Sequence, residues 1–112
     1  MSVKNAGDRF LLTDTEILKI DSPRNSIEVF KVIFIEKDER WAVVAANWDN
    51  EPRLCMRWFW GSTGFPQSHG WAAWMVITPK LADAILSKFL INPAERSKID
   101  KFLAGEIKGG AL

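Results

Sequence analysis

The side chains that could carry chemistry gather in the middle of this 112-residue chain. The only cysteine, Cys55, and the only histidine, His69, lie there, close to the hydroxyls of Ser62, Thr63 and Ser68. Nucleophilic catalysis needs a base within hydrogen-bond reach of the nucleophile. Cys55 stands between apolar neighbours, where a packed thiol is the commoner outcome, and no carboxylate near in sequence could orient His69. A small enzyme that uses Cys55 or His69 is therefore the third of three hypotheses.

Residues 61–70, GSTGFPQSHG, form a predicted loop whose three glycines suggest phosphate binding. Phosphate-binding loops end in Gly-Lys-Ser/Thr and run into a helix, whose N-terminal N–H groups hold the phosphate. This loop lacks that ending and is followed by a predicted strand. A single cysteine and a single histidine also fall short of the about four ligands of a zinc site. We expect neither a metal nor a cofactor.

Residues 53–60 alternate between the two faces of a predicted strand. Leu54 and Met56 share one face with Trp58 and Trp60, which is core composition, and we expect at least one of these tryptophans to be buried. The opposite face carries two arginines and is expected to be exposed to solvent. That face consists of Arg53, Cys55, Arg57 and Phe59.

The exposed face belongs to a basic and aromatic segment, because no acidic residue falls between Glu51 and Asp83. Trp71 follows a glycine and is the best candidate for an exposed aromatic ring. Aromatic rings exposed beside arginine form stacking platforms for single-stranded nucleic acid. The predicted ligand-binding residues are Lys31, Arg53, Arg57, Phe59, His69 and Trp71, whereas Trp41, Trp48 and Trp74 are assigned to packing.

Runs of β-branched and aromatic residues predict four strands, separated by turn residues. An earlier segment, residues 10–20, fits either a strand or a short helix capped at Thr13 or Asp14, and a strand is favoured. The four strands are predicted at residues 27–35, 41–48, 53–60 and 71–77.

Two helices are predicted after the strands, since a capping residue followed by proline is a typical helix start. The first begins at Thr78-Pro79, with Leu81, Ala84, Ile85, Lys88 and Phe89 spaced for one mostly apolar face. The second begins at Asn92-Pro93 and ends before Gly105. The predicted fold is α+β, with an antiparallel sheet of four to five strands followed by two C-terminal helices. We expect one domain over residues 1–112, with frayed ends at 1–9 and 106–112.

Partners and compartment follow from composition. Residues 27–35 are apolar on both faces, and one layer of helices can cover only one of them, so we expect a homodimer. The lone cysteine favours a reducing compartment, and no apolar run approaches the roughly 20 residues of a membrane span. We therefore expect a cytoplasmic protein with no membrane partner. The net charge of +1 is no signature of nucleic-acid binding, so only the distribution of charge could favour it.

The order of features over residues 41–84 resembles the positive-cofactor-four family of single-stranded-DNA-binding transcriptional coactivators. The turn WDNEPR at 48–53, the strand segment Met56-Arg57-Trp58, the glycine-rich loop and Val76-Ile77-Thr78 before the helix carry this resemblance. It implies a four-stranded antiparallel sheet followed by a helix, and contacts of Arg53, Arg57 and a nearby aromatic with a single strand. The chain departs from the family in its acidic turn at 36–40, its second helix and its basic strand residues, represented by Lys31 alone.

The leading hypothesis is a non-enzymatic binding module that binds single-stranded DNA or RNA through an arginine and aromatic sheet face. The alternative is a domain that binds a protein or a small ligand through the glycine-rich loop at 61–70. Basic and aromatic residues serve both kinds of ligand, and the sequence does not separate them.

Overall fold

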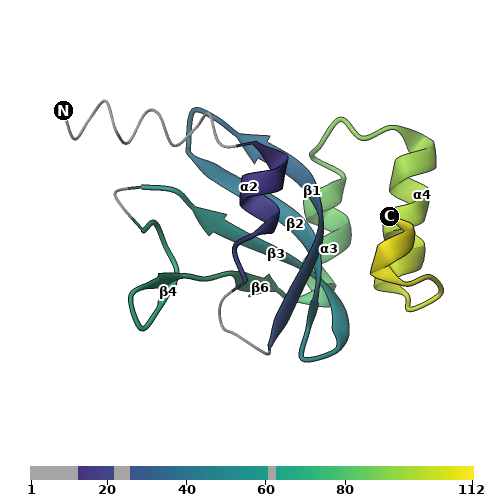
Figure 1. Ribbon diagram of the computed structural model, residues 1–112. Helices are drawn as coiled ribbons and strands as arrows, with labels where there is room; N and C mark the ends of the chain where they lie inside the picture. Colours follow the sequence, from purple (N-terminus) through teal and green to yellow (C-terminus); the bar gives the residue numbers. More distant parts are fainter. Residues whose placement is uncertain (1–12, 22–25, 61–62) are drawn as a thin grey trace.

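Four antiparallel strands form the main sheet in the order β1-β2-β3-β6, and two helices follow the last strand (Figure 1). The computed structural model describes residues 13–21, 26–60 and 63–112. The predicted α+β fold is thereby confirmed. The main strands are β1 (Ile27–Glu36), β2 (Trp41–Trp48), β3 (Glu51–Trp58) and β6 (Met75–Ile77); the small sheet pairs β4 (Gln67–Ser68) with β5 (Trp71–Ala72). The helices are α2 (Asp14–Leu18), α3 (Pro79–Leu86), α4 (Pro93–Leu103) and the short 3-10 helix η2 (Gly109–Ala111).

The strand predictions differ from the structure mainly after β2. The third strand occupies residues 51–58 instead of 53–60, and the segment predicted as one strand at 71–77 is divided into β5 and β6. Ala73 and Trp74 separate these two short strands and are both buried. The divided strand lets one chain segment belong first to the small sheet and then to the main sheet.

The strand favoured for residues 10–20 is wrong where the structure describes them, since α2 occupies residues 14–18. Thr13 and Glu16 form a capping box, in which each side chain accepts a hydrogen bond from the other residue's backbone N–H (3.2 and 3.0 Å). Ile17 of this helix is buried, and the indole of Trp74 donates to the carbonyl of Ile20 (2.7 Å). This hydrogen bond joins the segment after α2 to the segment just before β6.

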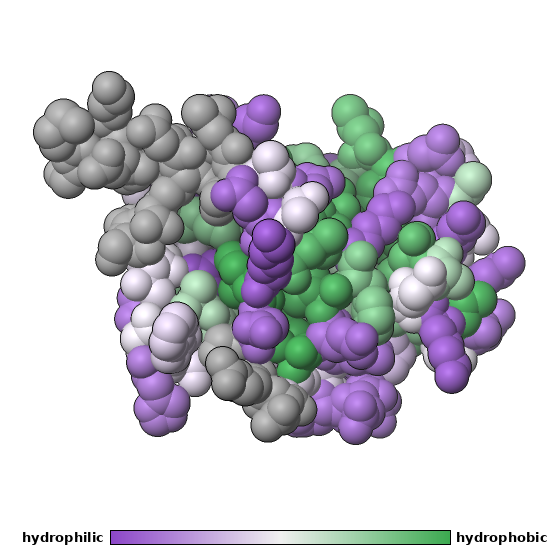
Figure 2. All heavy atoms as spheres, viewed as in Figure 1, coloured by the Kyte–Doolittle hydropathy of each residue, from purple (hydrophilic) through white to green (hydrophobic). Residues whose placement is uncertain are grey.

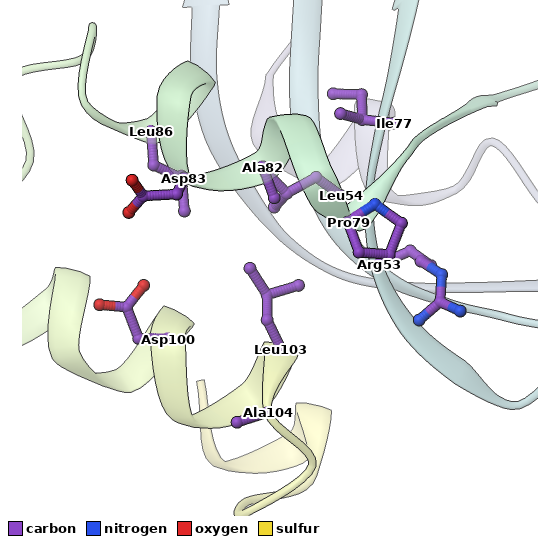
Figure 3. A pocket seen from close by; sticks show the side chains of 10 residues that line it. All are labelled: Arg53, Leu54, Ile77, Pro79, Ala82, Asp83, Leu86, Asp100, Leu103 and Ala104. Atoms are coloured by element: carbon purple, nitrogen blue, oxygen red, sulfur yellow. The ribbon is translucent and has the colours of Figure 1, made fainter.

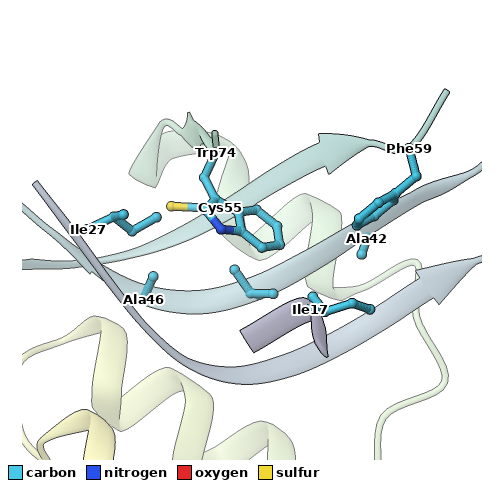
Figure 4. Close-up of a cluster of buried hydrophobic side chains, with 8 residues drawn as sticks. Ile17, Ile27, Ala42, Ala46, Cys55, Phe59 and Trp74 are labelled. Atoms are coloured by element: carbon cyan, nitrogen blue, oxygen red, sulfur yellow. The ribbon is translucent and has the colours of Figure 1, made fainter. Parts of the chain in front are cut away.

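The sheet is covered on both faces, and the expectation that one face would be bare is wrong. On one face α2, Phe59 and Trp74 cover a cluster that includes Cys55 (Figure 4). On the other face α3 and α4 cover Leu54, which is fully buried as predicted. The first cluster consists of Ile17, Ile27, Ala42, Val44, Ala46, Cys55, Phe59 and Trp74.

Neither Trp58 nor Trp60 is buried beneath the helices. Trp58 and Met56 are half-buried, and Trp60 keeps 53% of its surface exposed. The strand alternation was therefore right about the two faces of β3 but wrong in predicting that the arginine face is exposed to solvent, because the chain covers both faces.

The helix starts were predicted correctly, whereas the inward face of α3 was not. Ala82 and Leu86 are the buried residues of α3, while Leu81, in the predicted apolar face, is 54% exposed. The helix is turned so that part of its apolar surface faces away from the core. Helix α4 ends at Leu103 and is followed by Gly105 with a φ of +80°, as its C-terminal glycine suggested.

Strand β1 is an edge strand, and residues of the chain itself lie on both of its faces. Phe30 contacts Phe102 of α4 and Phe34 stacks on Phe89, while Val32 packs on the cluster beneath α2. In Figure 2 hydrophobic side chains remain visible across the middle of this view. The reason given for a homodimer, an uncovered face of residues 27–35, is thus removed, and the homodimer itself stays a prediction.

The described helices include none that is both long enough and apolar enough to cross a lipid bilayer. The predicted fraying of residues 1–9 lies outside the described residues. The predicted fraying of residues 106–112 is wrong, because η2 docks against the strands and Gly109 is buried beneath the ring of Phe30.

The packing of Gly109 gives a test of this docked end. A Cβ atom at Gly109 would collide with the ring of Phe30, whereas one at Gly110 would meet nothing within 4 Å. We expect Gly109→Ala to lower the free energy of unfolding by about 1–3 kcal/mol, the usual range for overpacking. Gly110→Ala is the matched control and should change it by less than about 0.5 kcal/mol. Urea denaturation of both variants measures the difference, and equal stabilities would show that the end is not packed.

Candidate ligand-binding site

The side chain of Arg57 is the largest fully buried one in the described chain, with 1% of its surface exposed. Its guanidinium donates to the carbonyl oxygens of Ala73 (2.7 Å), Pro66 (3.4 Å) and Thr63, and lies 5.1 Å from the ring of Phe59. Thr63 and Pro66 precede the β4–β5 hairpin and Ala73 follows it, so the three carbonyls lie on both sides of the hairpin in the segment that connects β3 to β6. Arg57 is thus a structural centre for residues 59–60 and 63–73, and the expectation that its side chain stands on a solvent-exposed face is wrong.

Backbone hydrogen bonds complete the frame of this segment. Trp58 and Phe65 exchange two of them (2.7 and 3.0 Å), and the N–H of Phe59 donates to the carbonyl of Arg40 (2.8 Å). Gly64, at a φ of +76°, lies so close to Arg57 and the carbonyl of Trp58 that a Cβ atom would collide with both. The glycine at position 64 is therefore required by packing as well as by its backbone conformation.

Three large aromatic side chains are exposed on this frame, and we call residues 59–60 and 63–72 the aromatic lobe. Trp60 is 53% exposed, Phe65 59% and Trp71 72%. The guanidinium of Arg40 lies 4.3 Å from the ring of Trp60, and the ring of Phe65 lies 6.3 Å from that of Trp58. The exposure of Trp71 was predicted from its neighbouring glycine. Trp60 and Phe65 were missed, although a loop rich in glycine and proline offers few neighbours to bury a large ring.

The β4–β5 hairpin carries Trp71 directly after its turn. His69 and Gly70 form its two-residue turn with φ values of +50° and +82°, as expected for a tight hairpin turn. Trp71 pairs directly with Ser68 across the hairpin, so both side chains stand on one face of it.

A groove of about 600 Å³ lies between this hairpin and the end of α2. The hairpin side offers Trp71, His69 and Ser68, and the other side offers Lys19 and Asp21. The groove therefore combines an aromatic ring, two groups that can carry positive charge, a hydroxyl and a carboxylate. Sequence reasoning missed Lys19 and Asp21, because nothing in the sequence places α2 beside residues 68–72.

The predicted binding residues do not form one surface. Arg57 and Phe59 are buried, while His69 and Trp71 are exposed together on the β4–β5 hairpin. Lys31 is half-buried on the side of α4, where its ammonium forms an ion pair with Glu95 (2.9 Å). In Figure 1 the β4 region and α4 stand at opposite sides of the sheet.

Arg53 lies at the end of a second cavity, of about 250 Å³, between the sheet and the two C-terminal helices (Figure 3). Its guanidinium points away from Asp83 and Asp100, which line the far side. Arg96 of α4 forms ion pairs with Asp83 (2.6 Å) and with Asp100 (3.0 Å). Because Asp83 belongs to α3, Arg96 joins the two helices. The other lining residues are mostly apolar, so this cavity is explained by the packing of the helices.

Cys55 is buried with no exposed surface, and the cluster around it is apolar. Burial raises the pKa of its thiol to about 12, although the charge of nearby Arg53 lowers it slightly. A thiol of this kind is protonated at neutral pH and is a poor nucleophile. His69 is exposed on the hairpin turn, so Cys55 and His69 stand in different environments. Among the described residues no three His, Cys, Asp or Glu side chains gather as a metal site would require.

No protein-family model, curated protein or solved structure matches this chain.

The contacts of Arg57 predict that the aromatic lobe depends on it. In Arg57→Met the carbonyls of Thr63, Pro66 and Ala73 lose their donor, at about 1–3 kcal/mol for each group left buried. We expect a loss of at least about 3 kcal/mol in the free energy of unfolding, and faster cleavage of the native protein by chymotrypsin at the lobe's aromatic residues. Arg53→Met, a half-buried control on the same strand four residues earlier, should cost less than about 1 kcal/mol. Equal effects in the two variants would contradict the role of Arg57.

The raised pKa of Cys55 predicts a loss of stability in alkali. Above the ordinary thiol pKa of 9.0 the unfolded chain loses this proton, while the folded protein keeps it up to about pH 12. Between these values the free energy of unfolding should therefore fall by about 1.4 kcal/mol per pH unit from this group. Denaturation at pH 8 and pH 10.5 should show a steeper fall in the wild type than in Cys55→Ala. Parallel falls, or rapid labelling of the native thiol at pH 7, would contradict the burial.

Proposed function

We propose that this chain is a non-enzymatic binding module that holds single-stranded nucleic acid on its aromatic lobe. The observation that carries the proposal is the exposure of Trp60, Phe65 and Trp71 by more than half within one short segment. Large aromatic side chains normally bury 150–250 Å² and dominate cores. When a small domain leaves three aromatic rings exposed to solvent, those rings offer flat surfaces on which planar groups of a ligand can stack. Nucleobases have such flat faces, and stacking of a base on an aromatic ring is worth about 1–3 kcal/mol.

The charge around the lobe favours a polyanion. No acidic residue occurs from position 52 to position 82, so the lobe itself carries no carboxylate. Arg40 beside Trp60, and Lys19 beside Trp71, stand where they can meet phosphates. The single carboxylate of the groove, Asp21, can accept hydrogen bonds from the amino groups of bases.

The proposed contacts differ from those first predicted. Arg57 supports the lobe from within, and Lys31 is engaged by Glu95, so neither contributes a phosphate contact. The resemblance to the single-stranded-DNA-binding family stays a prediction, because no family model matches the chain. The few cations at the lobe imply weak to moderate affinity and a shallow dependence on salt.

Fluorescence anisotropy with labelled DNA and RNA oligonucleotides, at two salt concentrations, tests the proposal. Trp71→Ala should weaken binding about 5- to 150-fold, the equivalent of one stacked base, and leave the salt dependence nearly unchanged. Leu90→Ala, which truncates a fully exposed hydrophobic side chain outside the lobe, should leave binding unchanged.

Charge variants separate the electrostatic part. Lys19→Gln should flatten the slope of log affinity against log salt by about 0.7, the value for one phosphate contact on a single strand. Lys98→Gln, on the exposed side of α4, is the control and should keep the slope. Absence of binding to every oligonucleotide at 50 mM salt, or equal binding by Trp71→Ala, would overturn the proposal and assign the lobe to a protein or small-molecule partner.

A further inference from the structure

The groove between the β4–β5 hairpin and the end of α2 has room for one nucleotide. Its volume of about 600 Å³ lies within the range of about 300–1,000 Å³ that is usual for small-ligand pockets. Trp71 stands on one side with 72% of its surface exposed, so the face of its indole is open to a stacked ring. Ile20 and Ala72 add apolar surface to the lining. The groove can therefore hold a flat base against Trp71.

A hydrogen bond ties the two sides of this groove together. The buried indole of Trp74 donates to the carbonyl of Ile20 (2.7 Å), which is the residue before Asp21. Trp74 is also close in sequence to Trp71, which lies on the hairpin side. The positions of Asp21 and Trp71 are thus linked through the protein, although the two residues are far apart in the chain.

Asp21 is the single carboxylate among the described residues that line the groove. An ionised carboxylate is an acceptor only, with two oxygens that can be bound at the same time. Guanine is the one common base with two adjacent donors on its Watson–Crick edge, the N1–H and the 2-amino group. Adenine and cytosine place one amino group beside an acceptor nitrogen, and in thymine and uracil the N–H lies between two carbonyls. The carboxylate therefore favours guanine over the other bases.

We propose that this groove is a guanine subsite, in which the base stacks on Trp71 while Asp21 accepts hydrogen bonds from N1–H and the 2-amino group. The inference rests on the proposed binding of single strands and names the base that the lobe prefers. Lys19, on the same side as Asp21, can meet the phosphate of the nucleotide. Ser68 stands on the same face of the hairpin as Trp71, where its hydroxyl can donate to the O6 atom of guanine.

Oligonucleotides that differ in one base test the preference. We expect thymine oligonucleotides with one central guanine to bind about 5- to 150-fold more tightly than all-thymine ones, the usual discrimination from one bidentate contact. Inosine at the same position lacks the 2-amino group and should lose most of this gain. Adenine or cytosine there should give little or none. Fluorescence anisotropy measures each affinity, and equal binding of all these oligonucleotides would overturn the subsite.

A matched pair of carboxylate variants assigns the preference to Asp21. Asp21→Asn should bind guanine-containing and all-thymine oligonucleotides alike, because an amide has only one acceptor oxygen. It should still fold, since Asp21 is exposed. Asp38→Asn removes the same charge from the turn between β1 and β2, away from the groove, and should keep the full preference. A guanine preference that persists in Asp21→Asn would contradict the proposal.

Free guanosine monophosphate separates failure of this inference from failure of the proposed function. At millimolar concentration it should shift the indole N–H signal of Trp71 in an NMR spectrum more than inosine monophosphate does, with the signal identified by its loss in Trp71→Ala. If guanosine monophosphate binds in this way and no oligonucleotide does, the proposed function falls and the guanine subsite stands. If oligonucleotides bind without regard to guanine, the subsite falls and the proposed function stands.

Discussion

The buried guanidinium of Arg57 is the interaction on which the rest of the excursion between β3 and β6 depends. Within residues 59–60 and 63–73 there is little regular structure, and β4 and β5 contribute only two residues each. Backbone carbonyls in such a segment need donors, and arginine supplies five N–H groups in one plane. A single side chain therefore replaces a set of strand hydrogen bonds, and the exposed aromatic rings owe their positions to it.

The same interaction explains what the sequence could and could not predict. The alternation of residues 53–60 correctly placed Leu54 and Cys55 on opposite faces, because a strand's period of two is set by local geometry. It could not show that Arg57 is dry. The three carbonyls that bind Arg57 lie 6 to 16 residues later in a segment of irregular structure. An arginine usually indicates a solvent-exposed strand face. That inference fails here because carbonyls distant in sequence accept the hydrogen bonds of the arginine inside the protein.

Other helices and strands could be predicted where the residues that determine them are neighbours in the sequence. The starts of α3 and α4 follow from a capping residue and a proline, and both were placed correctly. The capping box at Thr13 and Glu16 is an equally local signal, but the short apolar pairs around it drew the prediction towards a strand. Two bulges in β1, after Val29 and Val32, break its alternation. A bulge depends on the register with a neighbouring strand, which no single strand's composition reveals.

The bond from the indole of Trp74 to the carbonyl of Ile20 spans 54 positions of the chain. During synthesis α2 leaves the ribosome well before the residues that hold it. Its five residues are too few to form a stable helix alone. The cover over Cys55 can therefore close only after the chain has been made beyond residue 74. Until then the growing chain exposes an apolar sheet face, and chaperones that recognise such surfaces have that interval in which to bind it.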